Sequence, residues 1–123
     1  MIVITGAAGF IGSCLVSSLN SLGKTNLVLV DDFSSNEKNK NLYQKQFVKR
    51  IDRGLFIEWF ANNAADVLEV YHIGARTDTT ESNLAVFEKL NLGYSKSLWN
   101  ICTKYQIPFI YASSAATYGM GEF

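Results

Sequence analysis

The chain has 123 residues, which is enough for one domain with a hydrophobic core, and 48% of them are hydrophobic. Eleven basic residues balance eleven acidic ones, so the net charge gives no reason to expect binding to nucleic acid. No apolar stretch is long enough to span a membrane and the N-terminus lacks the basic segment of a secretory signal, so we expect a cytoplasmic protein without membrane association.

The predicted secondary structure alternates between strands and helices. We expect strands at about residues 1–5, 27–30, 46–48, 67–72 and 109–112, and helices at about residues 11–22, 55–62 and 84–105. The polar stretch 32–45 predicts a loop with at most one turn of helix, Gly23 is typical of the end of a helix, and Pro108 breaks the chain before the last strand. This alternation implies a doubly wound, Rossmann-like parallel sheet with the strand order 3-2-1-4-5, truncated before its last strands.

The spacing of apolar residues also predicts which side chains face the core. In the first helix these are Ile11, Leu15, Val16, Leu19 and Leu22, and in the second they are Leu55, Phe56, Trp59 and Phe60. Cys14 and Cys102 lie in helical segments and have no metal-ligand spacing. We therefore expect both to be reduced thiols that fill space, and we expect no metal site.

Three glycines directly after the first predicted strand indicate a phosphate-binding turn. A Cβ at Gly6, Gly9 or Gly12 would obstruct, respectively, the tight turn, the approach of a ligand and the contact between helix and sheet. The helix that follows supplies backbone N–H donors and the positive end of its dipole. The alternative is a turn whose glycines only permit tight packing. The preceding strand, the amphipathic helix and a distal acid favour a dinucleotide.

The distal acid is Asp31, which ends the second apolar run together with Asp32. A carboxylate at this position accepts hydrogen bonds from the adenosine ribose hydroxyls, which favours NAD, although it could also be a helix cap or a solvated acid. Lys38 and Arg53 favour the other cofactor, because either could approach the 2′-phosphate of NADP if the polar loop folds back over the adenosine. The residue types alone leave NAD and NADP open.

Small and polar residues also follow the fourth predicted strand. His72 ends that strand, and we interpret it as a packed, hydrogen-bonded histidine rather than a general base. Gly74 and Ala75 let the backbone approach a ligand near the nicotinamide half of a dinucleotide. Arg76 follows in a loop, where it pairs either with a substrate phosphate or with Asp78.

Small hydroxyl residues follow the fifth predicted strand. The segment 111–119 leaves room for a sugar and offers donors to a carbonyl oxygen that develops when an alcohol is oxidised. We expect Ser114, rather than Ser113, to provide that hydroxyl, with Thr117 as a secondary contact. The alternative is a Ser-rich turn that caps the next helix.

These residues resemble the extended short-chain dehydrogenase/reductases over essentially the whole chain. The matching features are the three-glycine turn, Asp31, His72-x-Gly74-Ala75, Asn91 in the long helix, and Ser113-Ser114-Ala115. More narrowly, the chain is similar to the ADP-L-glycero-D-manno-heptose 6-epimerase branch, through Thr79-Thr80-Glu81, Asn91-x-x-Tyr94-Ser95-Lys96 and the segment from Ile107 to Gly119.

The resemblance implies an isomerase with a nucleotide-sugar substrate and a bound NADP, NAD being the alternative. It implies that hydride transfer at C6″ of an ADP-heptose, and its return to the opposite face, inverts one centre in the synthesis of lipopolysaccharide core precursors. It also implies a homo-oligomer and a catalytic role for Ser114. The positions implied to line the cofactor are Gly6, Gly9, Phe10, Ile11, Gly12, Asp31, Asp32, Lys38, Arg53, Ile73, Gly74, Ala75, Arg76, Thr77 and Asn91.

One family feature is missing from the sequence, namely the Tyr-x-x-x-Lys pair that transfers the proton. For example, Tyr94 is followed four positions later by Leu98, and Tyr111 by Ala115. We therefore expect residues 1–123 to be the N-terminal part of an NAD(P)-binding domain, without its substrate domain and without activity alone. The alternatives are a UDP-sugar 4-epimerase or dTDP-sugar 4,6-dehydratase, and a non-catalytic dinucleotide-binding module.

Overall fold

The computed structural model describes residues 1–34, 36–73 and 84–111, and these residues contain a parallel five-stranded sheet. The order β3-β2-β1-β4-β5 confirms the predicted topology. The strands are β1 (Ile2–Thr5), β2 (Leu27–Asp31), β3 (Lys49–Asp52), β4 (Glu69–His72) and β5 (Phe109–Tyr111). Every neighbouring pair is parallel, so the carboxyl ends of all five strands lie at one edge of the sheet.

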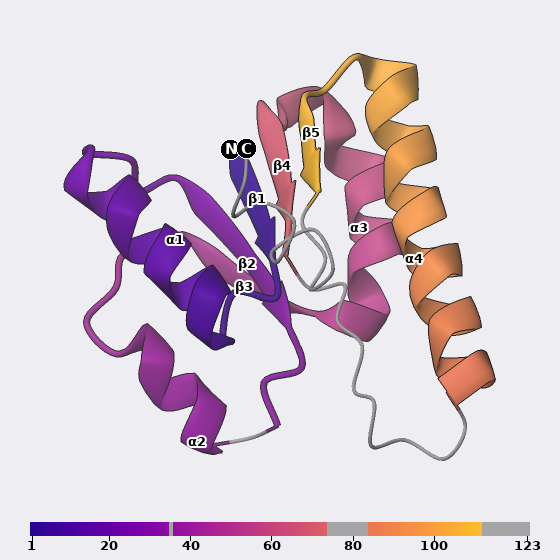
Figure 1. The fold of residues 1–123 in the computed structure, drawn as a ribbon. Coiled ribbons are helices and arrows are strands. Elements are labelled where there is room, and N and C mark those ends of the chain that lie inside the picture. Colours follow the sequence, from indigo (N-terminus) through magenta and orange to yellow (C-terminus); the bar gives the residue numbers. More distant parts are fainter. Residues whose placement is uncertain (35, 74–83, 112–123) are drawn as a thin grey trace, which may run out of the picture.

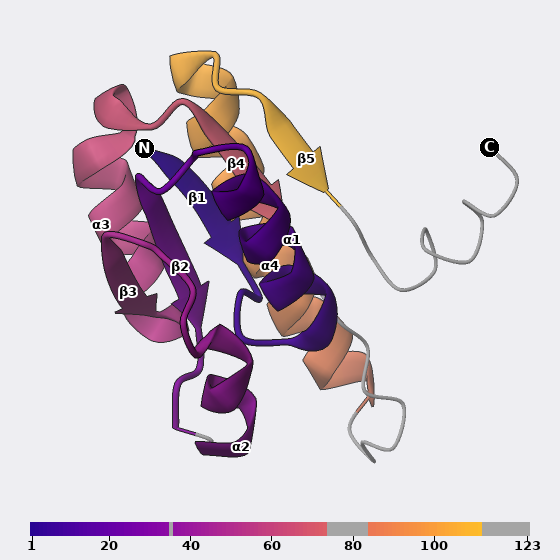
Figure 2. The same cartoon turned by 90° about the vertical axis from the view of Figure 1, so that its left-hand side faces the viewer.

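Helices cover both faces of this sheet, as Figures 1 and 2 show from two directions. α1 (Phe10–Ser21) packs on one face, and α3 (Arg53–Asn63) and α4 (Leu84–Tyr105) pack together on the other. The short α2 (Asn36–Asn39) and the 3-10 helices η1 (Lys40–Leu42) and η2 (Ala64–Asp66) complete the described elements. None of the helices in the described ranges is long and apolar enough to cross a membrane.

The two central strands, β1 and β2, are buried along their whole length. Their side chains alternate between two cores, as the period of a strand requires. The core under α3 and α4 contains Val3, Val28, Val30, Val70, Phe56, Phe60, Leu98 and Cys102, and the core under α1 contains Ile2, Ile4, Leu27, Leu29, Val16 and Leu19. The sheet is therefore a fixed frame for the loops at its carboxyl edge.

The end of α1 confirms the role predicted for Gly23. This residue has φ +82°, which is the left-handed region that favours glycine, and its N–H donates to the carbonyl of Asn20 at 2.9 Å. The N–H of Lys24 donates to Leu19 at 2.9 Å. These two bonds form a Schellman motif, which satisfies carbonyls at the C-terminus of the helix.

The predicted third strand at 46–48 is wrong, because the strand is Lys49–Asp52 and pairs with β2. The prediction was placed too early because the apolar residues Phe47 and Val48 lie just before β3. The strand itself lies at an edge of the described sheet, where exposed charged residues are tolerated and leave no apolar pattern. The helix α4 has the predicted bounds, because its apolar period is long and regular.

Several predicted core positions are on the surface. Ile11 is 52% exposed, Leu22 and Leu55 are more exposed still, and Cys14 is a free thiol on the surface, so the predicted burial of these four side chains is wrong. The buried face of α1 is narrower than the apolar spacing indicated, and Cys14 lies about 200° around the helix from the buried Val16. Cys102 is buried against the sheet, as predicted, and that burial raises the pKa of its thiol to about 11.

Candidate functional site

The three-glycine turn joins the end of β1 to the start of α1. Gly6 has φ 71°, so the turn requires the conformational freedom of glycine there. A Cβ on Gly12 would lie 2.0 Å from the carbonyl oxygen of Gly6, so Gly12 permits the helix to pack on the turn itself rather than on the sheet, which corrects the predicted contact. A Cβ on Gly9 would meet the same oxygen at an ordinary 3.4 Å. Its role in ligand approach stays a prediction.

The N–H groups of four successive residues of this turn donate hydrogen bonds within the protein. Gly6 and Ala7 donate to the carbonyl of Val30 at 2.7 and 3.3 Å, and Gly9 donates to the carbonyl of Gly6 at 3.1 Å. The N–H of Ala8 donates to Oδ2 of Asp31 at 2.9 Å. These amides shape the turn and are not available to a ligand in this conformation.

The next three amides, in residues 10–12, have no acceptor among the described residues and could serve a ligand. They form the first turn of α1, where no intrahelical acceptor exists, and the first bond of the helix runs from Ser13 to the carbonyl of Gly9 at 2.9 Å. Gly9 is the N-cap and offers no side-chain acceptor, and the first turn contains no acidic residue. Phe10 beside them is 78% exposed. Among the described residues, this helix end therefore keeps N–H donors and the positive end of a dipole, which are the features that attract an anion.

Asp31 lies beside this helix end, at the carboxyl end of β2, and its side chain is only 10% exposed. Besides the Ala8 amide on Oδ2, it accepts the N–H of Asp32 at 2.7 Å and Nζ of Lys38 at 3.0 Å on Oδ1. A carboxylate has about four lone-pair positions, so three are occupied. Asp31 therefore fixes the turn, a role that the sequence did not indicate, while ribose binding at the remaining position stays a prediction.

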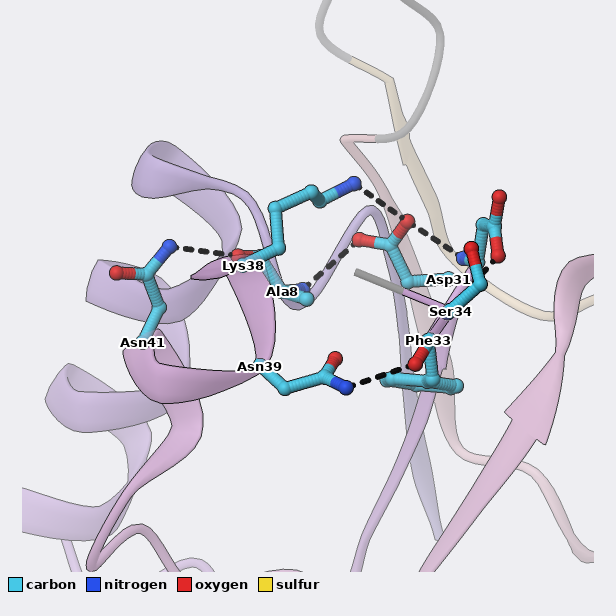
Figure 3. Close-up of polar contacts among 8 residues, drawn as sticks. Ala8, Asp31, Phe33, Ser34, Lys38, Asn39 and Asn41 are labelled. Atoms are coloured by element: carbon cyan, nitrogen blue, oxygen red, sulfur yellow. Dashed lines mark hydrogen bonds and ion pairs between the residues drawn. The ribbon is translucent and has the colours of Figure 1, made fainter. Parts of the chain in front are cut away.

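The polar loop does fold back, as the prediction for Lys38 required (Figure 3). Lys38 extends from α2 to Asp31. Arg53, at the start of α3, lies with its guanidinium carbon 4.8 Å from the ring centroid of Tyr94. Hydrogen bonds from Ser34 lower the pKa of Asp32, and the charges of Lys38 and Arg53 lower it further. Both cations thus act on the same end of the sheet.

His72 is buried and hydrogen-bonded at both ring nitrogens, as predicted. Nδ1 lies 2.6 Å from Oγ1 of Thr5, and Nε2 lies 2.8 Å from Oγ of Ser95. The imidazole stacks against Tyr94 and Phe109. Burial lowers the pKa of His72 to about 4, with a further contribution from Arg53. At neutral pH it is therefore an uncharged bridge between β1, β4 and α4.

The remaining predicted site residues fall in different places. The N–H of Ile73 donates to the carbonyl of Thr5 at 3.2 Å, so Ile73 continues from β4 beside the turn. Asn91 lies in α4, but its side chain is outside the description. The positions outside the described residues are Gly74, Ala75, Arg76, Thr77, Ser113, Ser114 and Thr117.

Two asparagines at this site were not predicted. Nδ2 of Asn41 donates to the carbonyl of Ala8 at 2.8 Å, and Nδ2 of Asn39 donates to the carbonyl of Phe33 at 2.7 Å (Figure 3). The repeated asparagines of the polar loop could have indicated these contacts, because asparagine side chains in loops commonly form hydrogen bonds with backbone groups. The sequence could not indicate which backbone group each would meet.

Comparison with known proteins finds a family whose model matches almost the whole length of the chain. The model of the NAD dependent epimerase/dehydratase family matches residues 2–123. The chain belongs to this family. Two curated relatives, the ADP-L-glycero-D-manno-heptose-6-epimerases of Fusobacterium nucleatum and Nitratidesulfovibrio vulgaris, are each 42% identical to it over 99% of its length. These matches confirm the predicted resemblance. The chain spans 37% and 38% of the length of those relatives.

Solved structures confirm the Rossmann-like fold of this epimerase/dehydratase family member. The UDP-glucose 4-epimerase of Thermotoga maritima has a TM-score of 0.68 and 27% identity, over 89% of this chain and 36% of that chain. The L-threonine dehydrogenase of Clostridium difficile has a TM-score of 0.71 at 24% identity, over 94% of this chain and 36% of that chain. The second likeness is one of fold alone.

The buried His72 predicts a loss of stability in mild acid. Its pKa is lowered from 6.5 to about 4, so between these values the unfolded chain binds a proton that the folded chain excludes. The stability present above pH 6.5 is therefore lost as the pH falls toward 4, by roughly 3 kcal/mol. Chemical denaturation across this range measures the loss. In His72→Gln, which does not titrate, the slope should shrink, and equal slopes would contradict the assignment.

The close contact of Gly12 predicts that Gly12→Ala is destabilising. The added methyl would meet the backbone of Gly6 at 2.0 Å, which forces the turn to move and costs about 1–3 kcal/mol. The matched control is Gly93→Ala in α4, where a Cβ would have no neighbour within 4 Å among the described residues and where alanine should stabilise the helix by up to about 1 kcal/mol. Urea denaturation of both variants tests this, and a Gly12→Ala protein as stable as the parent would refute the packing role.

Proposed function

We propose that the chain is the N-terminal, cofactor-binding part of a cytoplasmic nucleotide-sugar epimerase. The proposed reaction inverts C6″ of an ADP-heptose with a bound NADP, and the intact protein is proposed to be a homo-oligomer. The observation that carries the proposal is the open first turn of α1, at residues 10–12, next to the Asp31–Lys38 ion pair. The 42% identity to curated heptose epimerases supports the choice of substrate.

The described residues suit a dinucleotide. The amides of residues 10–12 would bind the pyrophosphate, because they offer N–H donors and a positive dipole at a solvent-exposed helix end. Asp31 has one acceptor position left for a ribose hydroxyl. When bound, the nicotinamide supplies the acceptor and donor for the hydride. Lys38 and Arg53 would add positive charge at the adenosine end.

The choice of NADP depends on charge. A 2′-phosphate beside a lone Asp31 carboxylate would be repelled. Here Lys38 lies 3.0 Å from that carboxylate and offsets its charge, and its side chain is 33% exposed to solvent. Arg53 adds a second cation at the same end of the sheet. We infer that these two cations accept the phosphate.

The direct test is the mass of the nucleotide released when the intact protein is denatured. NADP is the expected product. Release of NAD would overturn the choice of cofactor, and a protein that neither contains nor binds a nicotinamide nucleotide would overturn the whole proposal. The second candidate is a UDP-sugar 4-epimerase, because the chain is similar to the Thermotoga maritima enzyme. Assays with ADP-heptose and with UDP-glucose distinguish the two reactions. The 123-residue chain, which contains no Tyr-x-x-x-Lys, should show no turnover in the same assays.

Replacing Lys38 should weaken the binding of NADP selectively. In Lys38→Ala the cation facing the proposed phosphate is lost and Asp31 becomes repulsive, so we expect at least a tenfold rise in the Kd for NADP and less than a threefold change for NAD. Titration calorimetry on the cofactor-stripped intact protein measures both. Lys40→Ala removes an exposed cation two residues away and serves as the control. Equal losses for both nucleotides would argue against a phosphate contact.

A further inference from the structure

The side chain of Asn41 reaches the phosphate-binding turn from a distant part of the sequence. It lies in η1, and its Nδ2 donates to the carbonyl of Ala8 at 2.8 Å across a separation of 33 residues (Figure 3). The next residue, Leu42, is buried in the core under α1. That burial anchors η1 against the domain, so the amide of Asn41 is held beside the turn.

The bond from Asn41 completes the restraint of one peptide unit. The peptide between Ala8 and Gly9 has its carbonyl bound by Asn41 and its N–H bound by the carbonyl of Gly6 at 3.1 Å. The preceding N–H, of Ala8, is bound by Asp31 at 2.9 Å. The Ala8–Gly9 peptide immediately precedes the open amides of residues 10–12.

Hydrogen bonds on both groups of this peptide hold its orientation, together with the packing of the fully buried Ala8. Gly9 has φ −75° and ψ 174°, and among the described residues a Cβ there would meet one atom, at 3.4 Å, so Gly9 adds no steric restraint of its own. If the peptide turned over, the carbonyl oxygen of Ala8 would face the helix end. A carbonyl dipole there would repel an anion that the N-terminus of α1 otherwise attracts.

The segment 36–42 connects this peptide to the adenosine end of the site. Lys38 in the same segment pairs with Asp31, and Asn39 holds the carbonyl of Phe33 at 2.7 Å. One short segment therefore contacts the turn, the end of β2 and the loop after β2 (Figure 3). Its contact with the turn is made by Asn41.

We propose that Asn41 is a positioning residue for the pyrophosphate of the dinucleotide. It acts by keeping the carbonyl of Ala8 directed away from the anion-binding end of α1. This inference rests on the proposed function, because it requires a dinucleotide at this helix end. It assigns to Asn41 no direct contact with the nucleotide.

The test compares a probe that contains the pyrophosphate with one that does not. Asn41→Ala and the isosteric Asn41→Asp, which cannot donate to the carbonyl of Ala8, are titrated with NADP and with adenosine 2′-monophosphate in the cofactor-stripped intact protein. We expect the Kd for NADP to rise about tenfold in Asn41→Ala and more in Asn41→Asp. The Kd for adenosine 2′-monophosphate should change less than twofold. The matched control is Asn63→Ala, because Asn63 makes the same type of bond, to the carbonyl of Trp59 at 2.8 Å, on α3 away from the turn.

The outcomes separate this inference from the proposed function. A parent protein that binds neither probe refutes the proposed function. A parent that binds NADP while both variants bind it equally well refutes the role of Asn41 alone. Equal weakening of both probes, or a similar effect of Asn63→Ala, also refutes it, because a merely structural loss would not distinguish the pyrophosphate. Should Asn41→Ala fail to fold, Asn41→Asp, which keeps the volume of the side chain, decides the question.

Discussion

The carboxylate of Asp31 is the interaction on which the candidate site depends. An ionised carboxylate that is nine-tenths buried is unfavourable unless hydrogen bonds and an opposite charge compensate for lost hydration. Here the compensation comes from the Ala8 amide, the Asp32 amide and the ammonium of Lys38. Because these donors belong to the turn, the end of β2 and α2, one side chain fixes the positions of all three relative to one another.

The sheet makes this arrangement possible by keeping its carboxyl edge in place. β1 and β2 are buried on both faces, so neither the turn after β1 nor the loop after β2 can shift without disturbing both cores. His72 adds a polar restraint at the same edge, since it joins Thr5 at the end of β1 to Ser95 in α4. The strands and turns of the site are thus set by core packing, and the segment 36–42 combines polar contacts with the burial of Leu42.

The sequence predicted those features that depend on local patterns. The bounds of α4 and the role of Gly23 follow from apolar periodicity and from glycine at a helix end, and both signals are contained in a few neighbouring residues. The strand order follows from the alternation of strands and helices and from the right-handed crossovers of parallel sheets. The edge strand Lys49–Asp52 was misplaced because an exposed strand needs no apolar pattern. Asn41 was missed because its partner, the carbonyl of Ala8, is determined only by the path of the folded chain. The same holds for the structural bonds of Asp31.

These structural bonds also change what an acid at the end of β2 implies about a ligand. A free carboxylate there selects ribose hydroxyls by hydrogen bonding and excludes a phosphate by repulsion. In this chain Asp31 forms an ion pair with Lys38, and the positive charges of Lys38 and Arg53 stabilise the negative charge of Asp32. The local charge is therefore close to balanced, and repulsion no longer excludes a phosphate. Selection between the two dinucleotides then depends on whether Lys38 can bind a phosphate oxygen while it still holds Asp31. The hydrogen-bond geometry around Lys38, rather than the residue type at position 31, therefore decides this selection.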